Sequence, residues 1–259
     1  MTSKSQSAPS FRVEFAANSD VGRVRTRNED ALHVCPEHGW AILADGMGGY
    51  RGGDVAAHLA VTTALRRLEY EAAAQHAGTV ETVETVARSL ASAVGDANAE
   101  IHRVGIAEPD LAGMGATLLA VAFLSSQVVS AHVGDSRLYR WRDGAFEQLT
   151  RDHTMLQEQV DGGMMSAEDA RLSRYRGMLT RGVGVSVLVE PEVGVHGAGA
   201  GDIFLLCSDG LTDMLHDDEI STVLGGGEPL AATAERLVEL ANLHGGRDNV
   251  SVILARMVV

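Results

Sequence analysis

Short apolar runs separated by polar turns follow one another along most of the chain, and this pattern predicts β-strands. Three such runs occur in the N-terminal part, four in the middle and three in the C-terminal part. Asp143-Gly144, between two of the middle runs, is typical of a hairpin turn. The predicted strands cover residues 11–15, 31–35, 39–44, 115–124, 127–133, 137–142, 145–150, 187–195, 202–208 and 249–257.

Two pairs of amphipathic segments interrupt the strands. Apolar residues recur at three- and four-residue steps over 53–73 and 82–104, and helices are also predicted over 217–223 and 229–243. Residues 151–181 are polar, with methionines and short helical pieces, and we expect an inserted flap there over one edge of the fold. Two strand-rich halves with a helix pair in each predict an α+β sandwich rather than a parallel βαβ sheet.

The length of 259 residues suffices for one domain with a full hydrophobic core. Residues 1–10, MTSKSQSAPS, are polar and lack the apolar centre of a signal peptide, so we expect a disordered tail followed by a single domain over 11–259. No run reaches the ~18–20 apolar residues of a membrane span. A membrane anchor is therefore not expected.

The formal net charge of −14 argues against nucleic acid and anionic membranes as partners, because basic surfaces bind both. The only lysine is Lys4, in the polar tail, so the folded part cannot build a P-loop, a protein kinase site or a Schiff base. Cys35 and Cys207 form no CxxC pair and no disulfide framework. We interpret them as reduced core residues, which favours a cytoplasmic protein.

Five aspartates lie at the ends of predicted strands. Asp30 precedes the strand 31–35 and Asp45 follows the strand 39–44. If the turn between them is centred after Glu37, the pairing places these two carboxylates side by side. Facing carboxylates repel unless a cation lies between them, and Mg²⁺ and Mn²⁺ prefer such oxygen-rich sites. The five are Asp30, Asp45, Asp135, Asp209 and Asp248.

Ordinary turn chemistry is the alternative interpretation of each Asp-Gly pair, since turns favour both residue types. The run after Asp45 contains more glycines than a turn requires, at positions 46, 48, 49, 52 and 53. Such a run indicates that the backbone closely approaches an ion or a phosphate. The hydrophobic pattern alone leaves both interpretations open.

Seven motifs follow one another along the chain: SDVGRVRTRNED (19–30), ADGMGG (44–49), GMGATL (113–118), VGDSRLY (133–139), LTRDHT (149–154), LCSDGL (206–211) and GGRDNVSV (245–252). In this order they resemble the bacterial metal-dependent serine/threonine protein phosphatases of type 2C, the PPM family. The resemblance spans nearly the whole chain. It implies a four-layer αββα sandwich, in which helix pairs flank two antiparallel β-sheets, and hydrolysis of phosphoserine and phosphothreonine in proteins.

The resemblance also implies a centre of two metal ions, Mn²⁺ or Mg²⁺. Asp45 is expected to bridge both ions, the carbonyl of Gly46 to bind one, and Asp209 and Asp248 to hold the second. Asp135 matches the position of a third metal in bacterial relatives.

The catalytic groups implied by the resemblance are Arg25, Asp30 and Glu29. Arg25 matches the family's phosphate ligand, and a guanidinium can bind two phosphate oxygens at once. Asp30, with Glu29 beside it, is expected to orient water on the metals. A hydroxide that bridges the two ions then attacks the phosphorus.

Two departures from the family pattern limit the assignment. Met47 stands where animal relatives carry a histidine proposed as the general acid, so the source of that proton is left unassigned. The flap reads SRYRGMLTRGVG where relatives read HPxRN before LTRALG, with Ser173, Arg174 and Gly177 in the altered positions. Flap contacts and any flap ligand to a third metal are therefore unassigned.

The main alternative is a non-catalytic phosphoprotein-binding relative of the same fold, which the complete aspartate set disfavours. A two-metal hydrolase of nucleic acid is disfavoured by the acidic charge. A serine hydrolase is disfavoured because Ser208 lies in LCSDG rather than GxSxG. The expected partners are phosphorylated proteins and a cognate serine/threonine kinase, and the expected state is a cytoplasmic monomer.

Overall fold

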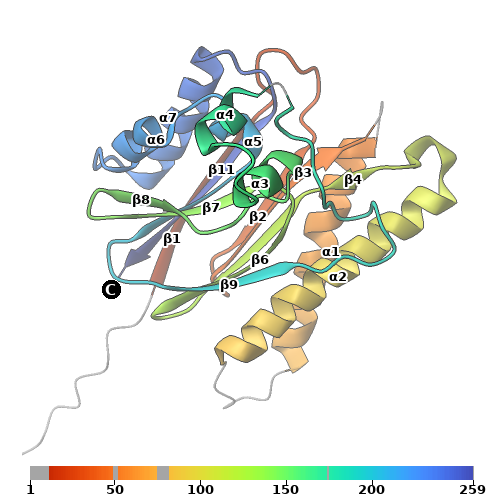
Figure 1. The fold of residues 1–259 in the computed structure, drawn as a ribbon. Helices are drawn as coiled ribbons and strands as arrows, with labels where there is room; N and C mark the ends of the chain where they lie inside the picture. The colour runs from red at the N-terminus through yellow and green to blue at the C-terminus, as the bar shows by residue number, and fades with distance from the viewer. Residues whose placement is uncertain (1–11, 49–51, 75–81, 174, 259) are drawn as a thin grey trace, which may run out of the picture.

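The computed structural model describes residues 12–48, 52–74, 82–173 and 175–258, and these form a layered sandwich (Figure 1). The predicted tail, together with Phe11, Gly49 and Arg174, lies outside the described residues. Two antiparallel sheets face each other. Helices α1 (Gly52–Ala74) and α2 (Val83–Ala107) cover one sheet, and α5 (Asp209–Thr212), α6 (Asp217–Leu224) and α7 (Leu230–Leu243) cover the other. The predicted αββα sandwich is confirmed.

The first sheet has the strand order β1–β11–β10–β7–β8, and the second has the order β2–β3–β5–β6–β9. Every pairing in both sheets is antiparallel. The first sheet contains β1 (Arg12–Asp20), β7 (Arg137–Arg142), β8 (Ala145–Gln148), β10 (Ile203–Cys207) and β11 (Val250–Val258). The second contains β2 (Asp30–Cys35), β3 (Trp40–Met47), β5 (Leu118–Phe123), β6 (Gln127–Val133) and β9 (Glu192–Gly197), and the short β4 (Gly115–Ala116) pairs with the end of β3.

The central strands are buried on both faces, so alternate side chains enter different core layers. In β10, Leu205 packs with the helices α6 and α7, whereas Phe204 packs between the sheets. There, the ring of Phe123 meets the rings of Phe15 and Phe204 edge to face, with centroids 5.5 Å apart in both pairs. This packing joins the two sheets.

The segment predicted as a flap contains α3 (Met155–Asp161) and α4 (Ala167–Leu172). Its two ends are tied together, because the Met155 N–H donates to Met178 O at 2.9 Å and the Thr180 N–H donates to His153 O at 2.8 Å. The inserted flap is therefore confirmed, and hydrogen bonds hold the two ends of the segment together where it leaves and rejoins the sandwich.

Two predicted strands differ most in their bounds from the structure. β1 runs on to Asp20 because it pairs with β11 along its whole length. The strand predicted over 187–195 is wrong in its first part, since β9 begins only at Glu192, after Pro191. The side-chain amide of Asn98, on α2, donates to the carbonyls of Ser186 and Val187 at 3.0 and 3.2 Å. These two carbonyls therefore bond to a helix side chain instead of to a neighbouring strand.

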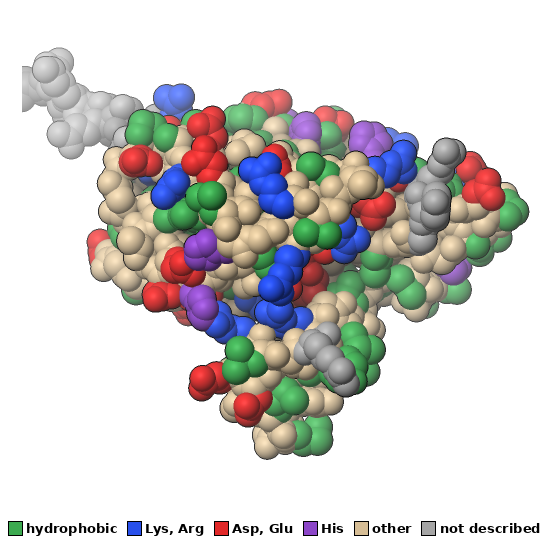
Figure 2. Space-filling view, turned by 90° about the horizontal axis from the view of Figure 1, so that it is seen from above, with side chains coloured by type: hydrophobic (Ala, Val, Ile, Leu, Met, Phe, Trp, Pro, Cys, Tyr) green, Lys and Arg blue, Asp and Glu red, His purple; other side chains and the backbone are tan. Residues whose placement is uncertain are grey.

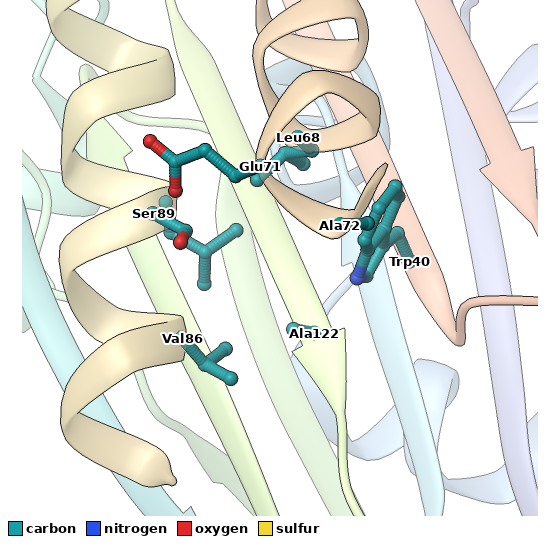
Figure 3. Close-up of a pocket in the computed structure, with 8 residues that line it drawn as sticks. Trp40, Leu68, Glu71, Ala72, Val86, Ser89 and Ala122 are labelled. Carbon is teal, nitrogen blue, oxygen red and sulfur yellow. The ribbon is translucent and has the colours of Figure 1, made fainter. Parts of the chain in front are cut away.

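A void of about 10 Å³ lies between α1, α2 and the second sheet (Figure 3). That volume holds at most one water molecule. The void is therefore a packing defect beneath the helices rather than a ligand site. Its lining includes Trp40, Leu68, Glu71, Ala72, Val86, Ser89 and Ala122.

Candidate metal centre

Asp30 and Asp45 lie directly opposite each other in the β2–β3 hairpin. The predicted register is thus confirmed. Burial raises the pKa of Asp30 to about 6, from an ordinary value of 3.8. The pKa of Asp45 is raised well above its ordinary value, first by burial and then by the charge of Asp30. The pair is electrostatically unfavourable as long as no cation balances it.

The backbone of Asp45 is fixed by Thr117, which follows β4. The Asp45 N–H donates to the Thr117 hydroxyl at 2.9 Å, and the Thr117 N–H donates back to the Asp45 carbonyl at 2.8 Å. The Thr117 hydroxyl also lies 2.7 Å from the buried hydroxyl of Ser136. Because Ser136 follows Asp135, this contact ties the end of β3 to the turn after β6.

Asp30 and Asp209 are joined across the two sheets by Ser208. The Ser208 hydroxyl donates to Asp30 Oδ2 at 2.8 Å and accepts the Ser251 N–H at 3.0 Å. Asp209, the next residue along the chain, begins α5. A single serine therefore sets the distance between a carboxylate of the second sheet and the end of β10 in the first.

All five predicted aspartates come together at this edge of the sandwich. After Asp30, the charges that raise the pKa of Asp45 are those of Asp209, Asp135 and Asp248. The pKa of Asp209 is raised well above its ordinary value by burial and then by Asp135. That of Asp135 is raised to about 7 by burial and then by Asp152.

Asn249 holds the loop that leads from β1 to β2. Its amide nitrogen donates to the carbonyls of Val21 and Arg27 at 3.0 and 2.8 Å, and its amide oxygen accepts the Glu29 N–H at 2.8 Å. We did not predict this role. The sequence signal for it is the asparagine beside Asp248, just before the last strand.

Arg25 lies on this loop and reaches the aspartate cluster at its rim. One guanidinium nitrogen lies 2.6 Å from Asp248 Oδ2, and the Arg25 side chain is about half exposed.

The carbonyl of Glu29 accepts the Gly46 N–H at 3.1 Å. The Glu29 carboxylate lies against Gly53 of α1, and its pKa is raised mainly by burial and then by Asp54.

The donor set fits divalent cations. Asp30 Oδ1 and Asp209 Oδ1 are buried without a hydrogen-bond partner in the part of the chain that the structure describes. A buried carboxylate oxygen without a partner is costly, and a cation removes that cost. The clustered carboxylates with raised pKa values supply the oxygen ligands that Mg²⁺ and Mn²⁺ prefer.

Gly46 lies where β3 passes α1 at close range. A Cβ at this position would overlap the carbonyl oxygen of Gly53 and come within 2.6 Å of the carbonyl oxygen of Glu29. The glycine therefore permits a backbone approach that no other residue type allows. This explains part of the glycine run after Asp45.

His132, His153 and Glu192 form a second group of potential metal ligands, with ligating atoms within 4.8 Å of one another. Other contacts already engage these groups. The His132 ring stacks on His153 and lies 2.9 Å from Arg151 O, while His153 Nδ1 accepts the Gly134 N–H and Nε2 lies 3.4 Å from Glu192. These contacts indicate a structural role for the two histidines, at the base of the flap.

The altered flap segment lies beside the aspartate cluster. Arg176 pairs at 3.7 Å with Asp213, which directly follows α5, and Gly177 packs close to Asp209. Ser173 accepts the Tyr175 N–H at 3.2 Å. The flap therefore contacts the region beside Asp209 through Arg176, which keeps the arginine of the family pattern, and through Gly177, which departs from it.

A sandwich of two sheets and outer helices, with buried carboxylates gathered at one edge, is the architecture of a metal-dependent phosphatase. The chain belongs to the protein phosphatase 2C family, whose model matches residues 22–245. None of the described helices combines the length and apolarity needed to cross a membrane.

Relatives from several bacteria are similar over almost the whole chain. The chain is 39% identical over 246 residues to serine/threonine protein phosphatase PstP of Mycobacterium tuberculosis, a match that covers 95% of this chain and 45% of that protein. The chain thus spans about half the length of this relative. Protein phosphatase PhpP of Streptococcus pneumoniae is 36% identical over 249 residues, 95% of this chain and 98% of PhpP.

A solved structure of the PstP catalytic domain contains two manganese ions. It matches the present structure with a TM-score of 0.84 and 38% identity, over 96% of this chain and 100% of that one. The predicted family and fold are therefore confirmed.

Proposed function

We propose that this chain hydrolyses phosphoserine and phosphothreonine in proteins with the help of Mn²⁺ or Mg²⁺. The observation that carries the proposal is the cluster of five aspartates in which Asp30 and Asp209 each keep a buried oxygen without a partner among the described residues. Family membership and the two manganese ions of the PstP structure support it.

For the metal centre we propose the ligands that the motifs imply. Asp45 would be a ligand of two ions, the Gly46 carbonyl would hold one, and Asp209 and Asp248 would hold the second. Asp135 would hold a third ion, and Asp30, with Glu29, would orient water at the centre. The ions supply an acidified water as nucleophile and neutralise charge on the phosphate.

The groups of the chain itself position the reaction. Asp248 Oδ2 is paired with Arg25 at 2.6 Å. A cation at Asp248 would compete with this guanidinium and free it to bind the phosphate, which can accept two hydrogen bonds from it. The loop of Arg25 stays in place meanwhile, because Asn249 holds its backbone at both ends.

Arg25→Ala is expected to raise KM for phosphate esters by about 10- to 100-fold, since a charge-assisted contact of about 1.5–3 kcal/mol is lost. Steady-state kinetics with p-nitrophenyl phosphate and a phosphothreonine peptide, each at saturating Mn²⁺, measures the effect. Arg27→Ala, on the same loop but paired with Asp54, is the matched control. An unchanged KM would place the phosphate contact elsewhere.

The proposed function itself is tested with metal-stripped protein and a phosphothreonine peptide. We expect release of phosphate only after Mn²⁺ or Mg²⁺ is added, and none in buffer without a divalent metal. Phosphate release that is unaffected by chelation would overturn the metal-dependent mechanism. A folded protein that binds the peptide without turnover under any divalent metal would support the non-catalytic alternative.

We further propose a single phosphatase domain over residues 11–259, opposed by a cognate serine/threonine kinase, in a cytoplasmic monomer. Two buried free thiols, Cys35 and Cys207, support a reducing compartment. The net charge of −14 supports phosphorylated proteins rather than nucleic acid or anionic membranes as partners. Size-exclusion chromatography with light scattering would test the oligomeric state.

A further inference from the structure

A cleft of about 720 Å³ lies between the flap helices α3 and α4 and the helices α5 and α6. Asp135 and Asp209 of the candidate metal centre belong to its lining. A polypeptide whose phosphorylated residue reaches that centre therefore has neighbouring residues in or beside this cleft. Figure 2 looks onto this end of the sandwich and shows acidic and basic side chains interleaved over the surface.

Seven carboxylates and three arginines line the cleft. Two of the arginines are already matched by carboxylates of the same lining. Arg137 donates to both oxygens of Asp152, with a shortest contact of 2.6 Å, and Arg176 pairs with Asp213 at 3.7 Å. The cleft therefore keeps an excess of negative charge.

The third arginine of the lining, Arg171 of α4, is not matched by a carboxylate among the described residues. Its guanidinium lies 2.7 Å from His216 Nε2, across the cleft at the start of α6. Arg171 thus faces the carboxylates of the lining that are not paired with Arg137 or Arg176.

Three carboxylates of the lining, which we call the outer acids, form no ion pair among the described residues: Glu168, Asp217 and Asp218. They lie in the first turns of α4 and α6, where the helix dipole alone favours an acid. Two further facts point to a ligand. The outer acids share one cavity with the metal centre, and the buried Oδ1 of Asp209, in the same lining, has no partner in the described part of the chain.

We propose that the outer acids bind basic side chains next to the phosphorylated residue, so that the enzyme prefers substrates with arginine or lysine beside the phosphoserine or phosphothreonine. This inference rests on the proposed function and adds the substrate class to it. Metal ions at Asp135 and Asp209 leave the outer acids as the negative end of the cleft. Complementary charge there steers the polypeptide and fixes its direction.

The test compares two phosphothreonine peptides of equal length that carry either arginine or alanine at the flanking positions, at low ionic strength with Mn²⁺. The wild-type protein is expected to give a kcat/KM ratio about tenfold in favour of the arginine peptide, since several partly exposed ion pairs add up to roughly this factor. The double variant Asp217→Lys, Asp218→Lys is expected to abolish or invert the ratio. A loss of bound metal or of folded protein does not change the ratio, because it lowers kcat/KM equally for both peptides.

Glu84→Lys is the matched control, because Glu84 lies exposed in the first turn of α2 and does not line the cleft. It is expected to leave the ratio at the wild-type value. A wild-type ratio near one, or a ratio that the charge reversal leaves intact, would overturn the inference while the proposed function stands. Absence of metal-dependent hydrolysis of both peptides and of p-nitrophenyl phosphate would overturn the proposed function, and the inference with it.

Discussion

Asp45→Asn is expected to lower Mn²⁺-dependent turnover by at least about a thousandfold, because the proposed bridge between two cations loses its charge. An asparagine at this position keeps the size of the aspartate and its backbone contacts, including the N–H bond to Thr117. The loss is therefore attributable to metal binding rather than to misfolding. Phosphate release from a phosphothreonine peptide, together with Mn²⁺ titration by calorimetry, measures both effects.

The same variant is expected to stabilise the metal-free protein at pH 8, with Tm higher by about 3–6 °C. The pKa of Asp45 is raised in the folded state, so folding takes up protons and the stability of the metal-free protein falls as pH rises. Asp30 and Asp135, with pKa values raised to about 6 and about 7, act in the same direction between pH 4 and pH 7. The advantage of Asp45→Asn should therefore shrink as the pH is lowered toward 4.

Asp143→Asn is the matched control for the charge change, because Asp143 lies exposed in the β7–β8 turn with φ +50°, a conformation that asparagine also adopts. It is expected to change neither turnover nor the pH profile of Tm. Full activity in Asp45→Asn would show that this carboxylate does not hold the metals. An unchanged Tm at pH 8 would show that repulsion within the cluster is already relieved without metal.

Gly46→Ala is expected to be strongly destabilising. The added Cβ would overlap Gly53 O, and the neighbours are backbone atoms that cannot rotate away. Overpacking against a fixed backbone costs more than about 3 kcal/mol here, and β3 must move away from α1. We expect a loss of Tm of about 6–12 °C and loss of Mn²⁺-dependent turnover.

Gly197→Ala in β9 is the control for this substitution, since no atom lies within 4 Å of a Cβ there. It is expected to leave Tm and turnover near the wild-type values. Thermal unfolding followed by circular dichroism, with and without Mn²⁺, separates the two variants. A Gly46→Ala protein with normal Tm would mean that α1 and β3 tolerate a wider spacing than the structure shows.

The Asp30–Asp45 register was predictable because a short turn determines the pairing of an entire hairpin. The positions of Asp135, Asp209 and Asp248 at strand ends followed from the same hydrophobic pattern. Their convergence was not predictable from periodicity, since it depends on how two sheets stack. Here the order of the seven motifs carried the prediction.

Contacts between residues far apart in the chain could not be predicted in this way. The Ser208–Asp30 hydrogen bond and the three bonds of Asn249 join segments about two hundred residues apart. The first part of the strand predicted over 187–195 was wrong for a related reason. The apolar residues at its start suited a strand, but the side chain of Asn98 on α2 donates to the carbonyls of Ser186 and Val187.

The position of β11 has a consequence for protein synthesis. This strand is the last of the described strands in chain order, yet it lies between β1 and β10, and Asn249 at its start holds the loop of Arg25. While residues 248–258 are still inside the ribosome, β1 has no partner in its sheet among the described strands and Arg25 has no anchor. A nascent chain is therefore expected to be inactive until this strand emerges, and to fold slowly because its first and last strands must meet.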